Sequence, residues 1–183
     1  MKGVIFNLLE DFICDGWGDE TYDALMSCCP LETKGPFVGP GTYPDSDLLK
    51  IVGATCKKLG ISVPDGLRAF GEYAFPRLVE KYPLFTDAEP TARSFLESVH
   101  DVIHVEVRKL LKNAVTPRFR YREGADGGLV MEYFSSRRLC ALIEGFVAGV
   151  ATHYATPIAL EHPICMHDGH DVCEIHLQFG DAA

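Results

Sequence analysis

Residues 95–113 read FLESVHDVIHVEVRKLLKN, and the interpretation of the whole chain starts from this stretch. On a helix, which turns by about 100° per residue, its apolar side chains gather on one broad face. These side chains are Phe95, Leu96, Val99, Ile103, Val107 and Leu110. His100 and His104 lie at the margin of that face. The pattern predicts an amphipathic core helix that carries two imidazoles at the edge of its buried side.

Each of these histidines has two interpretations. The first is a structural imidazole that forms a hydrogen bond with a neighbour at the edge of the core. The second is a ligand of a metal or of haem iron, because neutral imidazole is the commonest metal ligand and an apolar wall suits a planar cofactor. Periodicity does not distinguish His104 from His100, so the choice between them stays open at this level.

Composition limits the classes of protein that need to be considered. The 183 residues are 47% apolar, which is typical of a folded globule, and we expect one domain over residues 1–183. The net charge is −9, and no run of Lys or Arg is present. This charge balance argues against a partner made of nucleic acid.

The N-terminal residues MKGVIFNLLEDFIC resemble a signal peptide for only a short distance. Asn7 interrupts the apolar run, and Glu10 and Asp11 end it, so the run is too short for a secretory segment. No later run is long enough to span a membrane. We therefore expect a cytoplasmic protein without a membrane partner. In that reducing compartment, the seven cysteines point to metal binding, redox chemistry or simple burial rather than to disulfides.

The order of periodic segments predicts an α+β fold. Helical spacing predicts helices over residues 3–15, 19–28, 45–60 and 64–82, then from about residue 90, and over 137–153. Pro76 is expected to break or kink the fourth of these helices. Alternation predicts two hairpins, with strands at 116–123, 129–135, 158–165 and 172–179. The sheet is therefore expected in the C-terminal half of the chain.

Tyr133, Ser135 and Arg137 occur at alternate positions. If the strand extends through all three, a phenol, a hydroxyl and a guanidinium project from one face. Such a group suits a carboxylate or a phosphate, which Arg binds through two hydrogen bonds. The alternative is the polar face of a half-exposed strand.

Four motifs together carry a resemblance to a known family. They are MKGVIFNLLED at the start, VHDVIH at 99–104, Thr116-Pro117, and Tyr-x-Ser-x-Arg at 133–137. In this order they resemble the haem nitric oxide/oxygen binding (H-NOX) family, the gas-sensing module related to the haem domain of soluble guanylate cyclase. The resemblance covers essentially the whole chain. It implies a helical N-terminal part and a C-terminal part with a four-stranded antiparallel sheet.

The resemblance also implies a haem b cofactor and a role for several residues around it. His104 matches the proximal iron ligand, which leaves His100 as a flanking residue. Tyr133, Ser135 and Arg137 match the clamp for the haem propionates, and buried carboxylates do require such charge and donors. Pro117 matches a proline that packs against the porphyrin and distorts it.

The distal positions implied by the resemblance are apolar: Ile5, Leu9, Ala74, Leu78 and Leu142. Oxygen-binding members carry a tyrosine at the position of Leu142. A donor to bound oxygen contributes about 1.5–3 kcal/mol, or roughly 10- to 100-fold in affinity. Nitric oxide binds ferrous haem tightly without a donor. The chain is therefore expected to be a nitric oxide sensor without catalytic activity, and a haem peroxidase is disfavoured because no distal His or Arg is available for acid–base chemistry.

A second group of candidate ligands lies near the C-terminus. His162, Cys165 and Cys173 form a His-x2-Cys-x7-Cys run, which Cys140 could complete as a tetrahedral Zn²⁺ site. His167 and His170 are rival ligands, and buried or redox-active thiols are the alternative. The chain resembles a subset of the family, found with histidine kinases, that has a zinc site of this pattern.

The expected partners follow from the same resemblance. A sensor domain must pass its signal to another protein, so we expect a histidine kinase or a cyclic-di-GMP enzyme, that is, a diguanylate cyclase or phosphodiesterase. The alternative function is a zinc/thiol redox sensor that acts through the C-terminal cysteines, where oxidation would release the metal.

Overall fold

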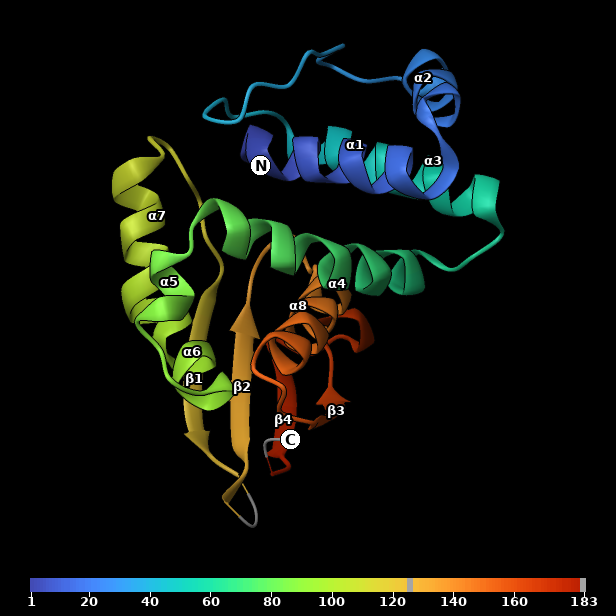
Figure 1. The fold of residues 1–183 in the computed structure, drawn as a ribbon. Coiled ribbons are helices and arrows are strands. Elements are labelled where there is room, and N and C mark those ends of the chain that lie inside the picture. Colours follow the sequence, from blue (N-terminus) through green and yellow to red (C-terminus); the bar gives the residue numbers. More distant parts are fainter. Residues whose placement is uncertain (125–126, 182–183) are drawn as a thin grey trace.

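The computed structural model describes residues 1–124 and 127–181 (Figure 1). Its helical elements are α1 (Gly3–Trp17), α2 (Asp19–Cys28), α3 (Asp45–Leu59), α4 (Val63–Lys81), α5 (Leu84–Asp87), α6 (Ala92–Ser98), the π-helical segment η1 (Val99–Ile103), α7 (His104–Leu110), α8 (Cys140–His153) and the 3-10 turn η3 (Met166–Asp168). Its strands are β1 (Arg118–Glu123), β2 (Leu129–Phe134), β3 (Ile158–Ile164) and β4 (Cys173–Phe179).

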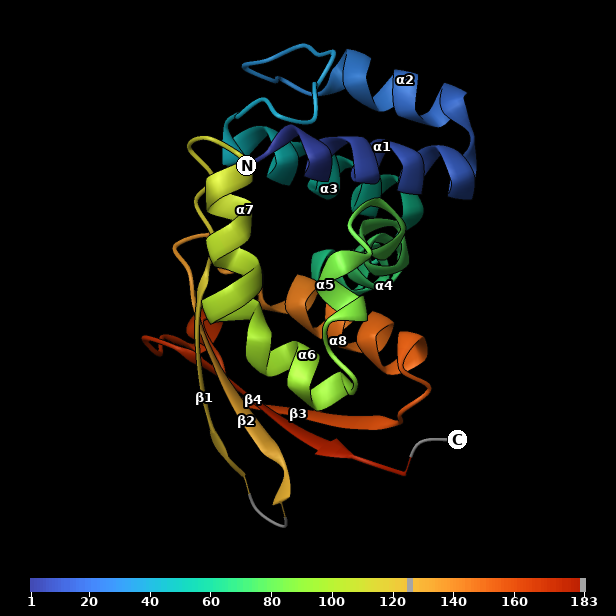
Figure 2. The same ribbon diagram turned by 60° about the vertical axis from the view of Figure 1, so that its left-hand side comes forward.

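The four strands form one antiparallel sheet in the order β1-β2-β4-β3. Helices α6 and α8 lie over the same face of this sheet (Figure 2). In β1 the exposed arginines alternate with Phe119, which is 5% exposed and points into the core. The predicted α+β class and the four-stranded antiparallel sheet are thus confirmed.

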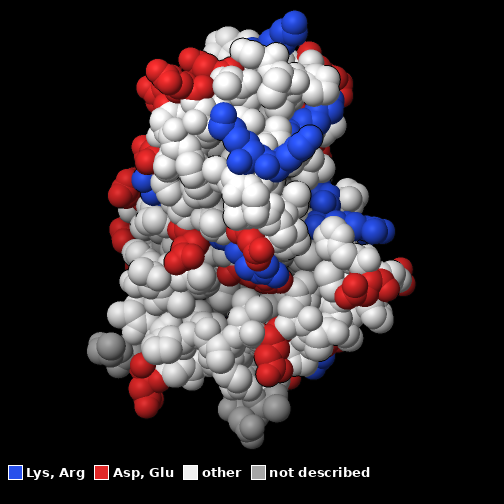
Figure 3. Space-filling model, turned by 90° about the vertical axis from the view of Figure 1, so that its right-hand side faces the viewer, with Lys and Arg blue, Asp and Glu red and all other residues white. Residues whose placement is uncertain are grey.

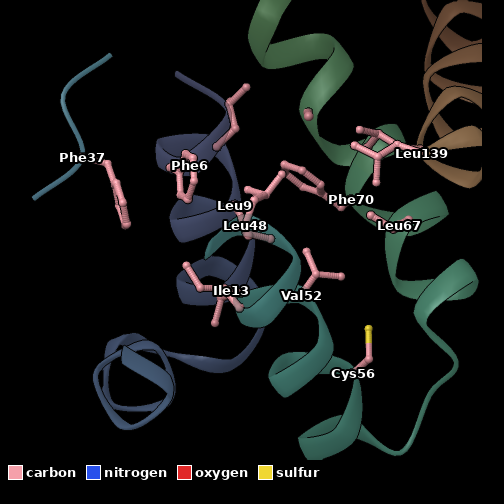
Figure 4. Close-up of a cluster of buried hydrophobic side chains, with 14 of the residues drawn as sticks. Phe6, Leu9, Ile13, Phe37, Leu48, Val52, Cys56, Leu67, Phe70 and Leu139 are labelled. Atoms are coloured by element: carbon pink, nitrogen blue, oxygen red, sulfur yellow. The ribbon is translucent and has the colours of Figure 1, made fainter. Parts of the chain in front are cut away.

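The buried apolar side chains form two clusters. The first cluster joins α1, α3 and α4 to Leu139, Ala141 and Leu142, and Figure 4 shows Leu9, Phe70 and Leu139 within it. The second cluster lies between the sheet and helices α6 and α8. Helix α4 contributes to both clusters, since Ala74 belongs to the first and Phe75 to the second. It therefore connects the N-terminal helices to the part of the chain that carries the sheet.

Helices α4 and α8 approach each other closely because glycines lie at their contact. A Cβ atom on Gly145 would lie 2.1 Å from the carbonyl oxygen of Arg68, and one on Gly71 would lie 2.5 Å from the carbonyl oxygen of Leu142. A Cβ on Gly149 would likewise meet the side chain of Phe75 at 2.5 Å. No larger residue fits at these positions without moving one helix away from the other.

The stretch that was expected to be one regular helix is divided into three. Thr91 caps α6, η1 follows as a π-helical turn, and α7 ends at Leu110. A π turn accommodates an extra residue and so shifts the helical register after it. The prediction that Leu110 lies on the buried face was wrong, because its side chain is 66% exposed.

Other boundaries also differ from the prediction. Strand β2 ends at Phe134 and α8 begins at Cys140, so the intervening residues form a connection in which Arg138 has a positive φ of 51°. Helix α4 continues through Pro76, whose side chain is exposed, and the expected break does not occur. The residues between 82 and 90, for which no helix was predicted, contain the short helix α5.

Two surface properties complete the description. Lys, Arg, Asp and Glu side chains are interspersed on the face shown in Figure 3, with uncharged surface between them. Among the described residues, no helix has both the length and the apolar composition required to cross a bilayer.

Candidate functional site

His104 is the first residue of α7, directly after the π turn. Its ring stacks on Phe119 of β1, with 5.7 Å between the ring centroids and an interplanar angle of 27°. Its Nδ1 atom is buried and has no hydrogen-bond partner within the described chain. A buried polar atom without a partner is costly, so this imidazole is suited to a ligand that supplies one.

The environment of His104 keeps its ring neutral. Burial, followed by the nearby His100 and Arg108, lowers the pKa of His104 to about 4, and the carbonyl group of Pro117 only partly offsets this effect. A neutral imidazole at pH 7 offers a nitrogen lone pair, which is what metal coordination requires. The same contact places the backbone of Pro117 beside the candidate ligand.

His100 occupies a different environment. Its Nδ1 accepts a hydrogen bond from the backbone N–H of Phe119 over 3.3 Å. It therefore fixes the start of β1 against η1, which is the structural interpretation of this histidine. The structure thus distinguishes two imidazoles that periodicity left equivalent.

The three residues of the Tyr-x-Ser-x-Arg motif do not lie along one strand as expected. Tyr133 lies within β2 and is 2% exposed, whereas Ser135 and Arg137 follow the end of the strand. The hydroxyl of Tyr133 accepts a hydrogen bond from the N–H of Leu139 over 3.1 Å. The hydroxyl of Ser135 accepts one from the N–H of Arg137 over 3.2 Å. A tight connection, rather than strand alternation, therefore holds the two hydroxyls, each by a backbone N–H group of the residues that follow.

Arg137 joins this connection to the N-terminal helices. Its Nε donates to Asp45 of α3 over 2.7 Å, and its Nη1 donates to the carbonyl oxygen of Val115 over 2.8 Å. Burial raises the pKa of Asp45, but the N-terminal ammonium of Met1 and Arg137 outweigh burial, and the pKa is lowered overall. The guanidinium borders a cavity of about 150 Å³, which is lined by Met1, Asp45, Leu48, Leu49, Ser136, Arg137 and Leu139.

The five predicted distal residues come from three helices and belong to one region. Leu9, Ala74 and Leu142 are buried in the first apolar cluster, and Ile5 and Leu78 pack against that cluster. Their side chains offer no hydrogen-bond donor. His104 lies apart from them, against Phe119 of the second cluster. The candidate ligand and the apolar wall thus belong to different parts of the core.

The C-terminal Cys and His residues converge. One ligand atom from each of Cys140, His162, Cys165 and Cys173 lies within 4.8 Å of the other three. The sulfur of Cys165 is 3.8 Å from that of Cys140 and 4.0 Å from that of Cys173. Thiolates about 2.3 Å from a tetrahedral zinc ion are separated by about 3.8 Å, so the spacing fits a four-coordinate site.

Burial affects the acidity of the thiols in this group. Burial, together with the neighbouring cysteines, raises the pKa of Cys140 and of Cys173. A divalent cation removes this penalty, because it stabilises the thiolates directly. The rival His167 is exposed and lies 2.8 Å from the carbonyl oxygen of Arg138, and His170 is also exposed.

A family model described as haem-NO-binding matches residues 2–162 of the chain. The chain belongs to the haem-NO-binding family. Members of this family bind haem and act as gas-sensor domains rather than as enzymes. The resemblance inferred from the sequence motifs is thereby confirmed.

Solved structures of haem-NO-binding proteins are similar over almost the whole chain. An H-NOX protein from Shewanella oneidensis in the Fe(II)NO state has 30% sequence identity and a TM-score of 0.94, covering 99% of this chain and 100% of that one. An unliganded Fe(II) H-NOX protein from K. algicida has 28% identity and a TM-score of 0.88, covering 99% and 97% of the two chains. The β-2 subunit of soluble guanylate cyclase from Rattus norvegicus is 29% identical over 91 residues, which are 48% of this chain but 13% of that subunit.

The residues of this chain fit the haem that the family binds. His104 supplies a neutral imidazole with a buried nitrogen that has no partner in the described chain. Phe119 packs on both His104 and Tyr133, with centroid distances of 5.7 and 5.6 Å, and so connects the imidazole to the Tyr-x-Ser-x-Arg motif. The motif offers a guanidinium and two hydroxyls for carboxylates.

Two residues that contact the candidate haem residues were not expected from the sequence. Asp45 has the appearance of a helix-capping residue and Phe119 that of an ordinary core residue. Each makes its main contact with a residue distant in sequence, so no local pattern could reveal it. The one available signal was the position of Phe119 two residues after Pro117.

Proposed function

We propose that the chain is a haem-based nitric oxide sensor in which His104 is the proximal ligand. The observation that carries this proposal is the neutral, half-buried imidazole of His104, whose buried Nδ1 atom has no partner in the described chain. Tyr133, Ser135 and Arg137 would hold the propionates, and Pro117 would pack against the porphyrin. Asp45 is then a competitor, because its carboxylate already occupies the Nε donor of Arg137.

The preference for nitric oxide follows from the distal side chains. Ile5, Leu9, Ala74, Leu78 and Leu142 cannot donate a hydrogen bond to a bound gas. A pocket of this kind does not stabilise bound oxygen through a hydrogen bond, whereas nitric oxide binds ferrous haem tightly without one. These five distal residues therefore favour nitric oxide over oxygen.

The signal would begin at His104 and pass to the chain through α7. Bound ferrous haem would supply an iron whose bond to the imidazole weakens when nitric oxide binds. Release of His104 frees the first residue of α7, which is joined to α6 only by the π turn η1. The other end of this segment is held by Lys2, whose Nζ donates to the carbonyl oxygen of Lys112 over 3.2 Å. Motion of α7 is thus conveyed to the N-terminal helices, with the glycine contact at Gly71 as the pivot.

We further propose that this motion is read by a separate protein. A histidine kinase or an enzyme that makes or degrades cyclic-di-GMP is the expected partner. Titration of a candidate kinase with the ferrous and the nitric oxide-bound protein tests this step, since only a kinase activity that differs between the two states supports it.

The proposal is tested by absorption spectra of the purified, reduced protein under argon, air and nitric oxide. We expect a Soret band that shifts with nitric oxide and is unchanged by air. Leu142→Tyr should introduce a donor and raise oxygen affinity by roughly 10- to 100-fold. A stable oxygen complex of the unaltered protein would show that the distal residues are wrongly assigned, and the absence of a Soret band after haem reconstitution would refute the central proposal.

We also propose that Cys140, His162, Cys165 and Cys173 bind one structural zinc ion. The convergence of their four ligand atoms within 4.8 Å supports this site. The reduced chain should retain one zinc per molecule, and Cys173→Ala, which removes a fully buried ligand, should release it. Metal analysis after dialysis measures this loss, with Cys28→Ala as the control because Cys28 is exposed and outside the cluster.

The convergence of three thiols also favours a second candidate function, a zinc/thiol redox sensor. In that case peroxide would oxidise the thiols and release zinc without any haem. Thiol counting and metal analysis of haem-free protein before and after peroxide separate the two functions. Retention of zinc and of all thiols at peroxide levels that oxidise a free cysteine would exclude redox sensing.

A further inference from the structure

Glu144 of α8 lies between the candidate metal site and helix α4. Its side chain is only 10% exposed. Its Oε1 lies 2.6 Å from Nδ1 of His162, and its Oε2 accepts from Nε of Arg68 over 2.5 Å. Both carboxylate oxygens are therefore engaged, one by β3 and the other by α4.

The second ring nitrogen of His162, Nε2, is buried and, unlike Nδ1, lacks a hydrogen-bond partner within the described chain. A carboxylate next to Nδ1 favours the tautomer that carries its proton there, because the N–H then donates to the carboxylate. The lone pair of the imidazole is consequently left on Nε2. Carboxylates that bind the outer nitrogen of a zinc-ligating histidine orient the ring and raise its basicity in this way.

We propose that Glu144 is the positioning residue of the metal site: it holds His162 as an Nε2 ligand and joins the site to α4 through Arg68. This inference rests on the zinc site proposed above. It adds to that site a residue that does not belong to the Cys and His ligand motif. The ion that fits is Zn²⁺, with three thiolates and one neutral imidazole as its ligands.

The charge balance explains why Arg68 belongs to the arrangement. Three thiolates and a zinc ion carry one net negative charge, and Glu144 would add a second beside it. The guanidinium of Arg68 offsets that charge and fixes the second oxygen of the carboxylate. Arg68 is 47% exposed and also contacts Asp65 over 2.8 Å, so solvent screens it and its main contribution is orientation.

The contact between Glu144 and Arg68 places the candidate metal site next to the point where α4 and α8 approach each other most closely. The carbonyl oxygen of Arg68 is the atom that excludes a side chain at Gly145, the residue after Glu144. About two and three turns further along α4 lie Ala74 and Leu78, which belong to the proposed distal wall. A change at the metal site is therefore transmitted to the turn of α4 that precedes this wall.

The test is the zinc affinity of the full chain with its haem, measured by equilibrium dialysis against a competing chelator. Glu144→Gln and Glu144→Ala should weaken zinc binding by about 10- to 100-fold. Glu161→Gln is the matched control, since Glu161 is exposed and adjacent to His162. Hydrogen exchange gives a second readout: zinc should slow amide exchange around Arg68 in the unaltered protein and not in Glu144→Ala.

The outcomes separate the two proposals. If the unaltered chain binds no zinc, the metal site itself is wrong. If it binds zinc and Glu144→Gln equals Glu161→Gln, the metal site stands and the role of Glu144 is refuted. Thermal unfolding of the zinc-free variants shows whether they fold. If Glu144→Gln does not fold, ¹⁵N NMR of His162 in the zinc-loaded, unaltered protein decides, since zinc on Nδ1 would overturn the proposal and zinc on Nε2 with a proton on Nδ1 is the expected result.

Discussion

Replacement of His104 by glycine should remove haem from the purified protein, and imidazole in the buffer should restore it. Of the two histidines in the 95–113 stretch, His104 is the one whose Nδ1 atom is buried without a partner in the described chain, and burial lowers the pKa of its ring to about 4. Removing the outer partner of a metal ligand already costs about 10- to 100-fold in affinity, so loss of the ligand itself should cost at least about 100-fold. The ratio of Soret to protein absorbance measures the loss.

Rescue by imidazole follows from the position of the ring. In His104→Gly the space against Phe119 is vacated, whereas Phe119 and the Tyr-x-Ser-x-Arg motif are unchanged. Free imidazole can then occupy that space and bind iron without a bond to α7. The substitution thus detaches the iron from the helix while the haem remains bound. A kinase response to nitric oxide should be absent in the rescued protein, because α7 is no longer connected to the iron and does not move when the iron–imidazole bond changes.

His100→Ala is the matched control. His100 accepts a hydrogen bond from the N–H of Phe119, so its removal leaves that donor unpaired and should cost about 1–3 kcal/mol of stability. It should keep its haem. Loss of haem from His100→Ala together with retention by His104→Gly would mean that the two histidines have been assigned the wrong way round.

Gly145→Ala should cause the largest loss of stability among single-methyl substitutions at the helix contact. The added Cβ would lie 2.1 Å from a backbone oxygen, which cannot move aside by a change of rotamer. Overpacking of this kind costs about 1–3 kcal/mol and occasionally more. For a chain of this length, a loss of about 3 kcal/mol lowers the midpoint of thermal unfolding by about 6–12 °C.

Gly53→Ala provides the comparison. Gly53 lies within α3, and none of the residues that the structure describes places an atom outside that helix's own backbone within 4 Å of the position its Cβ would occupy. Alanine is favoured over glycine in a helix by about 1 kcal/mol, so this variant should unfold at a higher temperature. Circular dichroism on both variants measures the difference. An equal response of the two would show that α4 and α8 are not in close contact in solution.

The sequence predicted the fold well where a pattern was local. Alternation placed the strands, and helical spacing placed α1 to α4 within a few residues. The π turn was missed because its residues, VHDVI, have no composition that separates a π turn from an α turn. The exposure of Leu110 was missed for the same reason, since the register change occurs before it.

The residues of the candidate sites also divide into those that a local sequence motif revealed and those that it did not. The haem and zinc residues were named from motifs, and the structure brings the four zinc candidates together. The pairs Asp45–Arg137 and Glu144–Arg68 join residues 92 and 76 positions apart. From the sequence alone, both acidic residues look like ordinary exposed residues on the surface of a helix. Only the packing of α3 and α4 against the later part of the chain gives them a partner.

The π turn η1 also sets the direction in which the candidate iron ligand points. If Val99–Ile103 took α-helical geometry with all five residues kept, the helix after the turn would rotate by about 100° relative to the sheet. The imidazole of His104 would then face away from Phe119. Deletion of one residue from the turn compensates for that rotation, so this region should tolerate the loss of one residue, whereas an insertion of one residue directly before His104 would be as damaging as the loss of a ligand.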